Sequence, residues 1–191
     1  LVLVLVVPVS VPVPVPATGL VSVLVPALIP VLVAVLATLG VGGTTILMPK
    51  SDVVQFLEIA QRERVTHAML VPVQYQRIMD CADFDQRDLS SFHVKFCTSA
   101  PFAAALKADV LRRWPGGLIE FYGMTEGGGT CILAAHEHPT KLHTVGRPVE
   151  GHDIRLIDDE EREVARSSDL PAQGHSAMGE IVGHSPGMMT G

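Results

Sequence analysis

The run FYGMTEGGGT places an aromatic ring, a hydroxyl and a carboxylate directly before three glycines. Tyr122 offers a flat face for a ring such as a purine, and Gly123 lets backbone come close to that ring. Thr125 can donate a hydrogen bond to a phosphate oxygen, and Glu126 offers the hard oxygen ligand that Mg²⁺ prefers. The glycines that follow would leave backbone N–H groups free to face an anion. Together these residues suit Mg-ATP.

A second interpretation of this run needs no ligand. The residues can form a strand that ends in a glycine-rich turn, with Thr125 and Glu126 in solvent. Glycine costs chain entropy wherever it stands, which favours a functional reason for three in a row. The motif is short, however, so its residues alone leave both interpretations open.

The elements that must position this run alternate along the chain. Short apolar runs that are rich in β-branched residues predict strands, and amphipathic stretches between them predict helices. This alternation implies a parallel sheet covered by helices, so the fold class is α/β, followed by a small β-rich segment. We expect strands at residues 44–49, 65–71, 94–100 and 118–123, helices at 53–60, 73–80 and 102–114, an α/β portion over 34–146 and the β-rich segment over 147–191.

Two loops follow the third and fourth of these strands. One is TSAP, residues 98–101, and the other is the YGMTE loop. Ligands of open parallel sheets bind at the carboxyl ends of the strands. If the two strands are neighbours, both loops face one crevice, which is the predicted binding site.

Residues 1–33 differ from the rest because no charged residue precedes Lys50. A transmembrane helix is one interpretation, since about 20 apolar residues can span a bilayer. Six prolines, which remove helical hydrogen bonds, and the Val-Pro repeats favour an extended chain instead. The segment also lacks the basic start of a signal peptide. We therefore leave it unassigned, as a low-complexity leader, a corrupted stretch of sequence or a structural element.

Charge and cysteine content exclude several classes of protein. The formal net charge of −6 gives no basic surface for nucleic acid. Cys81, Cys97 and Cys131 lie far apart, which argues against a disulfide framework or a CxxC metal site and fits the reducing cytoplasm. Cys97 lies within an apolar run, so we expect a buried core cysteine and not a catalytic thiol.

Two other groups of residues could bind a metal. His136 and His138 alternate, so both could point one way from a strand, but no third ligand has a suitable spacing. The acidic run over residues 158–163 is a second candidate. A solvated loop and a solvated turn are the favoured interpretations of these two segments.

YGMTE matches the YGxTE signature of the adenylate-forming superfamily, which includes acyl-CoA synthetases, aryl-acid ligases, luciferases and peptide-synthetase adenylation domains. Three other segments resemble family patterns in the same order, so the resemblance covers about residues 34–191. The chain is most similar to the fatty-acyl and related carboxylate–CoA ligases, because its middle segments are apolar. The three segments are DLSSFHVKFCTSAPF for "DLSSLR…SGGAPL", HTVGRPVEGHDIRLID for "GSVGRPxPGxExRIVD" and GEIVGHSPGMMTG for "GEIxxRGPxVMxGY".

The resemblance implies a reaction in two steps. A carboxylate attacks the α-phosphate of Mg-ATP to give an acyl-adenylate and pyrophosphate, and a thiol, usually coenzyme A, then displaces AMP. It implies nucleotide-binding residues Ser99, Ala100, Pro101, Tyr122, Gly123, Met124 and Thr125, catalytic residues Thr125 and Glu126, Glu126 as the Mg²⁺ ligand, and an acyl pocket bordered by Thr98 and Met124.

The chain also departs from the family pattern. Nothing in residues 1–43 resembles the family's upstream phosphate loop, and the ribose-binding aspartate, hinge and C-terminal lysine would lie beyond Gly191. Thr98 and Ser99 stand where many members have glycines, so we expect a narrower pocket. We therefore expect a middle portion of a ligase for an aliphatic acid, inactive by itself. The alternatives are a non-catalytic nucleotide- or partner-binding remnant and a membrane-anchored α/β module.

Overall fold

The computed structural model describes residues 2–6, 35–48, 50–124, 126–127, 129–168 and 177–188. The chain divides into two compact units. Unit 1 comprises Leu1–Glu120 and Ala134–Thr144, and unit 2 comprises Phe121–Leu133 and Val145–Gly191. The domain boundaries predicted at residues 34 and 147 stay predictions.

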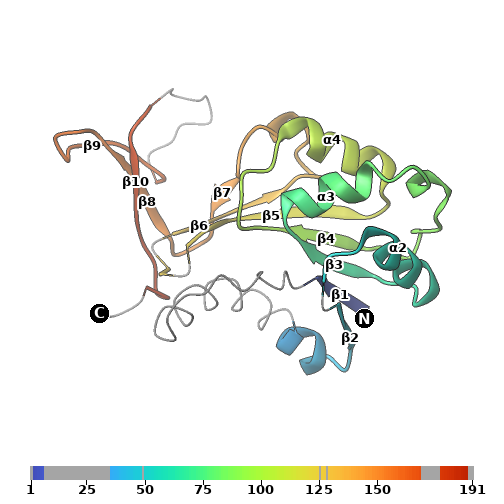
Figure 1. Ribbon diagram of the computed structural model, residues 1–191. Coiled ribbons are helices and arrows are strands. Elements are labelled where there is room, and N and C mark those ends of the chain that lie inside the picture. The colour runs from blue at the N-terminus through green and yellow to red at the C-terminus, as the bar shows by residue number, and fades with distance from the viewer. Residues whose placement is uncertain are drawn as a thin grey trace, which may run out of the picture. The chain divides into compact units, whose positions relative to one another are not determined.

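Unit 1 is built on a parallel sheet, as predicted (Figure 1). In its described part the strand order is β2-β1-β3-β4-β5. Residue Leu3 of the β1 strand pairs with Thr45 on one side and His67 on the other. The strands are β1 (Val2–Val6), β2 (Thr44–Met48), β3 (His67–Leu70), β4 (Val94–Cys97) and β5 (Gly117–Gly123), and β5 runs on into unit 2.

The β1 strand comes from the segment that the sequence left unassigned. Val2–Val6 lies between β2 and β3, so at least this part of residues 1–33 is a structural element. The rest of that segment lies outside the described residues. In the part of the chain that is described, no helix has the length and apolar character needed to cross a membrane.

Residues 35–40 form a helical segment, and three further helices accompany the sheet of unit 1. The Asp52 side chain accepts a hydrogen bond from Gln55 N at 3.0 Å, which caps the first of them as expected from the sequence. Helix α2 packs on α3 and α3 on α4, and Figure 1 shows α3 and α4 side by side along the sheet. The helices are α2 (Val53–Arg62), α3 (Pro72–Met79) and α4 (Ala104–Arg113), with 3-10 turns η1 (Phe84–Gln86) and η2 (Pro139–Lys141).

The core of unit 1 is centred on Trp114, which directly follows α4 and is buried. Its indole ring lies 5.8 Å from the ring of Phe56 and 5.9 Å from that of Tyr75. The rings of Phe84 and Phe92 lie 5.6 and 5.1 Å away. Aromatic rings dominate the burial of such cores, so this cluster joins α2, α3, η1 and the segment before β4 to the end of α4.

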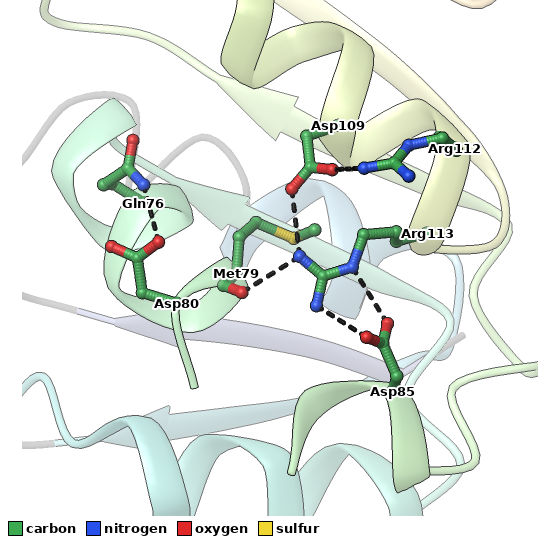
Figure 2. A network of polar contacts seen from close by, with 7 residues as sticks. All are labelled: Gln76, Met79, Asp80, Asp85, Asp109, Arg112 and Arg113. Atoms are coloured by element: carbon green, nitrogen blue, oxygen red, sulfur yellow. Dashed lines mark hydrogen bonds and ion pairs between the residues drawn. The ribbon is translucent and has the colours of Figure 1, made fainter. Parts of the chain in front are cut away.

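Arg113 connects three of these elements at the edge of the core (Figure 2). Its guanidinium donates to both carboxylate oxygens of Asp85, at 2.9 and 3.0 Å, and to Asp109 at 3.0 Å. It also donates to the carbonyl oxygen of Met79 at 3.1 Å, at the end of α3. Bidentate pairing of this kind fixes geometry as well as charge, so Arg113 holds α3, η1 and α4 together.

Unit 2 contains the small β-rich segment that the sequence predicts. Two strands expected there, within HDIRLIDD and GEIVGHS, are present as β8 and β10. The turn after β8 is closed by a hydrogen bond from Asp158 N to Arg162 O at 3.0 Å, and residues 159–163 are exposed, which confirms the solvated turn. The strands are β6 (Thr130–Ala134) and β7 (Arg147–Pro148), which pair antiparallel, and β8 (Asp153–Ile157), β9 (Glu163–Arg166) and β10 (Glu180–His184), which form an antiparallel sheet in the order β10-β8-β9.

Candidate functional site

The TSAP loop of unit 1 begins where β4 ends at Cys97, three residues earlier than predicted. The strand stops there because Ser99 has a φ of 75°, in the left-handed region that a strand does not use. The side chains of Ser99, Ala100 and Pro101 are exposed, and that of Thr98 is half-buried. The loop therefore presents these residues to solvent, where a ligand could reach them.

The residue that directly follows this loop, Phe102, anchors it to the core of unit 1. Phe102 is buried, and its ring stacks on that of Tyr75 at a centroid distance of 5.1 Å. The Tyr75 hydroxyl donates to the carbonyl oxygen of Phe96 in β4 at 2.8 Å, and burial raises the pKa of that phenol. The loop is thus held between a packed ring and the strand that precedes it.

The YGM part of the second loop lies at the end of β5, in unit 2. Tyr122 is 40% exposed and Met124 is 63% exposed, so a ligand can reach both side chains. Thr125 lies outside the described residues. A small pocket of about 80 Å³ is lined by Tyr122, Gly123, Met124, Gly129, Ile154, Ile181 and Gly183.

The glycines of this loop serve close packing, which corrects part of the sequence interpretation. Gly127 has a φ of 82°, and a Cβ there would lie 2.4 Å from the carbonyl oxygen of Gly187. A Cβ on Gly129 would lie 2.8 Å from the Ile154 side chain. Gly127 N donates to the Met124 carbonyl oxygen at 3.2 Å, so the prediction that this N–H is free to face an anion is wrong.

The Glu126 carboxylate is the predicted metal ligand. Its side chain is exposed, and among the described residues no ion pair involves it. An exposed carboxylate beside a tightly packed loop fits a Mg²⁺ ion, which commonly uses one or two protein carboxylates and substrate phosphates. No group of three metal-ligating side chains occurs among the described residues.

The predicted site residues fall in both units. Tyr122, Gly123 and Met124 line one pocket in unit 2, while residues 98–101 lie in unit 1. The single crevice that both loops would face stays a prediction.

The sequence interpretation missed a buried ion pair that joins α4 to β5. The Lys107 ammonium of α4 pairs with the Glu120 carboxylate, and both side chains are almost completely buried. Lys107 also donates to the carbonyl oxygen of Thr144 at 2.9 Å. Cys97 is buried nearby, as predicted, and burial with the Glu120 charge raises the pKa of its thiol. A lysine at an inward position of an amphipathic helix was the available signal.

His136, a candidate metal ligand, has a structural environment instead. Its Nδ1 lies 3.3 Å from Leu118 N, which can donate to it. A Cβ on Gly117 would lie 2.9 Å from the imidazole, so the ring packs directly on the start of β5. His136 is exposed in the turn after β6, which agrees with the solvated loop expected from the sequence, and its ring also packs on β5.

Comparisons with known proteins agree with the quoted motifs. A sequence model of the family described as AMP-binding enzyme matches residues 19–191. A 4-coumarate–CoA ligase of Pinus taeda is 30% identical over 161 residues, which are 82% of this chain and 28% of that protein. A medium/long-chain-fatty-acid–CoA ligase of Mycobacterium tuberculosis is 30% identical over 120 residues, or 62% of this chain and 21% of that protein.

The solved structures point the same way. The amide bond synthetase McbA of Marinactinospora thermotolerans superposes with a TM-score of 0.66 and 28% identity, over 78% of this chain and 29% of that one. This chain therefore spans less than a third of the length of these relatives. With a family match over most of its residues and four family motifs in order, the chain belongs to the AMP-binding enzyme family.

Proposed function

We propose that the protein carrying this chain is an ATP-dependent acid–thiol ligase of the cytoplasm, which joins an aliphatic carboxylic acid to coenzyme A. The observation that carries the proposal is the pocket at the end of β5, which three residues of the YGMTE motif, Tyr122, Gly123 and Met124, help to line. A loop at the carboxyl end of a parallel strand that lines a pocket favours a ligand over a purely structural turn.

The chain's own residues would bind and orient the substrates. Tyr122 and Gly123 would lie along the adenine, and Ser99, Ala100 and Pro101 would lie on its other side. Thr125 would donate to a phosphate oxygen. Thr98 and Met124 would border the acid, and the half-buried Thr98 would narrow that pocket. Such positioning lowers the barrier to reaction because it fixes the reactants before the reaction begins.

The chemistry needs oriented donors and cations more than a protein nucleophile. A carboxylate oxygen of the acid forms a bond to the α-phosphorus, and the bond from that phosphorus to the bridging oxygen breaks, releasing pyrophosphate. In the second step the thiol sulfur bonds to the acyl carbon, AMP leaves with the electron pair, and the thiol proton passes to solvent. Mg²⁺, when bound by Glu126, would neutralise phosphate charge.

The nature of the acid is the finer part of the proposal. The relatives include a ligase named for an aromatic acid and one named for medium and long aliphatic chains. The apolar middle strands of this chain favour the aliphatic class. A panel of aliphatic acids and coumarate in the same assay would separate the two classes. The location in the cytoplasm is supported by three free cysteines, Cys81, Cys97 and Cys131.

The test is acid-dependent exchange of label between pyrophosphate and ATP, measured on the protein that carries this chain. We expect E126A to lower the rate about a hundredfold or more, as loss of one transition-state contact commonly does. The matched control is E150A, because Glu150 is also an exposed glutamate of unit 2. An unchanged rate in E126A removes Glu126 from the mechanism. Binding of Mg-ATP by the unaltered protein without any exchange favours the non-catalytic remnant.

A further inference from the structure

A serine outside the YGMTE motif contacts the loop that carries Glu126. Ser185 directly follows β10, which ends at His184, and its side chain is buried. Its hydroxyl donates a hydrogen bond to the carbonyl oxygen of Gly127. This bond joins residues that are 58 positions apart in the chain, and it lies next to Glu126. This bond therefore holds the buried hydroxyl against the loop.

The backbone beside Ser185 also lies against this loop. Met188 N donates to Ser185 O at 3.2 Å, which closes a turn over residues 185–188. The carbonyl oxygen of Gly187, within that turn, lies where a Cβ on Gly127 would have to go. The turn and the loop therefore meet backbone to backbone, and the Ser185 hydroxyl is the polar side-chain bond across this contact.

We propose that Ser185 is a positioning residue, which fixes the Gly127 backbone and so sets where the Glu126 carboxylate lies. The proposal rests on the proposed function, in which Glu126 holds Mg²⁺. A short loop rich in glycine has many accessible conformations, and ordering it at the moment of binding costs free energy. A bond already made in the free protein removes part of that cost, which is the general benefit of preorganisation.

The sequence supports a role for the hydroxyl beyond forming the turn. The family pattern "RGP" has glycine where this chain has Ser185 in HSP. A turn that glycine can form does not require a hydroxyl. The hydroxyl of this chain is therefore an added contact, and its effect can be removed with little change to the turn itself.

The experiment compares S185A, S185T and unaltered protein by amide hydrogen exchange without ligand. We expect the amides of residues 123–130 to exchange roughly fivefold faster in S185A, as loss of one hydrogen bond implies. S185T keeps the hydroxyl and should restore slow exchange. The matched control is S91A, which removes a hydroxyl that donates to the Val65 carbonyl oxygen at 2.8 Å in unit 1. It should leave residues 123–130 unchanged.

Kinetics provide a second measurement, because a serine with only a structural role would not change the Mg²⁺ requirement alone. In pyrophosphate exchange, S185A should need roughly fivefold more Mg²⁺ for half-maximal rate, while the half-saturating acid concentration stays the same. Unchanged amide exchange in S185A, or an equal change in the demand for Mg²⁺ and for acid, would overturn the proposal. If the unaltered protein shows no pyrophosphate exchange, the proposed function fails, and amide exchange alone decides the role of Ser185.

Discussion

The two units hold their candidate loops in different ways. In unit 1, the TSAP loop is followed by Phe102, which is buried on Tyr75, and Tyr75 in turn contacts Trp114. In unit 2, the YGM loop is held by glycines that meet neighbouring backbone and by one serine hydroxyl. The loop of unit 1 is thus held by packing of large side chains, and the loop of unit 2 is held by close approach of backbone segments.

Burial shows the same contrast. Most of the buried apolar side chains in the described part of the chain belong to unit 1, whereas unit 2 contributes Cys131 and Leu133. Burial of apolar area is the dominant favourable term in folding. Side-chain truncation should therefore be costly in unit 1, and substitutions that add a Cβ should be costly in unit 2.

The largest expected effect is on the aromatic core. W114A removes the ring that contacts Phe56, Tyr75, Phe84 and Phe92, and should lower the free energy of unfolding by about 3–5 kcal/mol. I154A, in the half-buried β8 strand of unit 2, should cost roughly 1 kcal/mol or less. Denaturant unfolding of both variants measures the difference. Equal losses would show that unit 2 depends on side-chain volume as much as unit 1 does.

The buried ion pair gives the next effect. K107M removes one partner and leaves the Glu120 charge buried, which should cost about 3 kcal/mol. The double variant K107M/E120Q removes both charges and should recover much of that loss. Denaturant unfolding compares the three proteins. If the double variant is no more stable than K107M, the pair is not the reason for the loss, and packing of the lysine stem is.

Two glycines of unit 2 test the importance of backbone approach. Gly127 and Gly151 both have positive φ, at 82° and 81°, but a Cβ on Gly151 would meet only Pro186 at 3.9 Å. G151A should cost about 1 kcal/mol for its conformation alone. G127A should cost about 2 kcal/mol or more, because Gly187 O must also move. Thermal unfolding checks both, and equal shifts would contradict the contrast between the units.

Local patterns predicted the central elements of unit 1 well. Apolar runs and the Asp52 cap correctly indicated β2 to β5 and α2 to α4, because these elements follow residue propensity. The β1 strand was not predicted, because its pairing with β2 and β3 is a long-range contact within a segment dominated by Val and Pro. A pairing between distant segments leaves no local sequence signal such as an apolar run or a helix cap.

The YGMTE motif indicated residues that lie together in the structure, while their ligand-binding roles stay predictions. The sequence indicated Tyr122, Gly123 and Met124, which line one pocket in the structure. It did not indicate Ser185 or the Lys107–Glu120 pair, since these act through contacts between distant parts of the chain. It also misjudged Gly127, whose N–H is used in a turn, because free and bonded N–H groups look the same in a sequence.

The smallest expected effect is the change in stability with pH that a buried lysine of unit 1, Lys95, should cause. It tests whether the core of unit 1 tolerates a charged group. The Lys95 ammonium donates to three carbonyl oxygens, those of Trp114, Pro115 and Gly116, at 3.1, 2.6 and 2.9 Å. Burial lowers the pKa of Lys95 from its ordinary 10.5 to about 7.

Above pH 7 the unfolded chain therefore binds more protons at Lys95 than the folded chain does, so stability should rise with pH. Relative to K95M, which cannot titrate, the free energy of unfolding should increase by about 1 kcal/mol between pH 7 and pH 8. Denaturant unfolding of both proteins at these two pH values measures the change. A constant difference would mean that Lys95 stays charged in the fold, because the three carbonyl oxygens offset the cost of its burial.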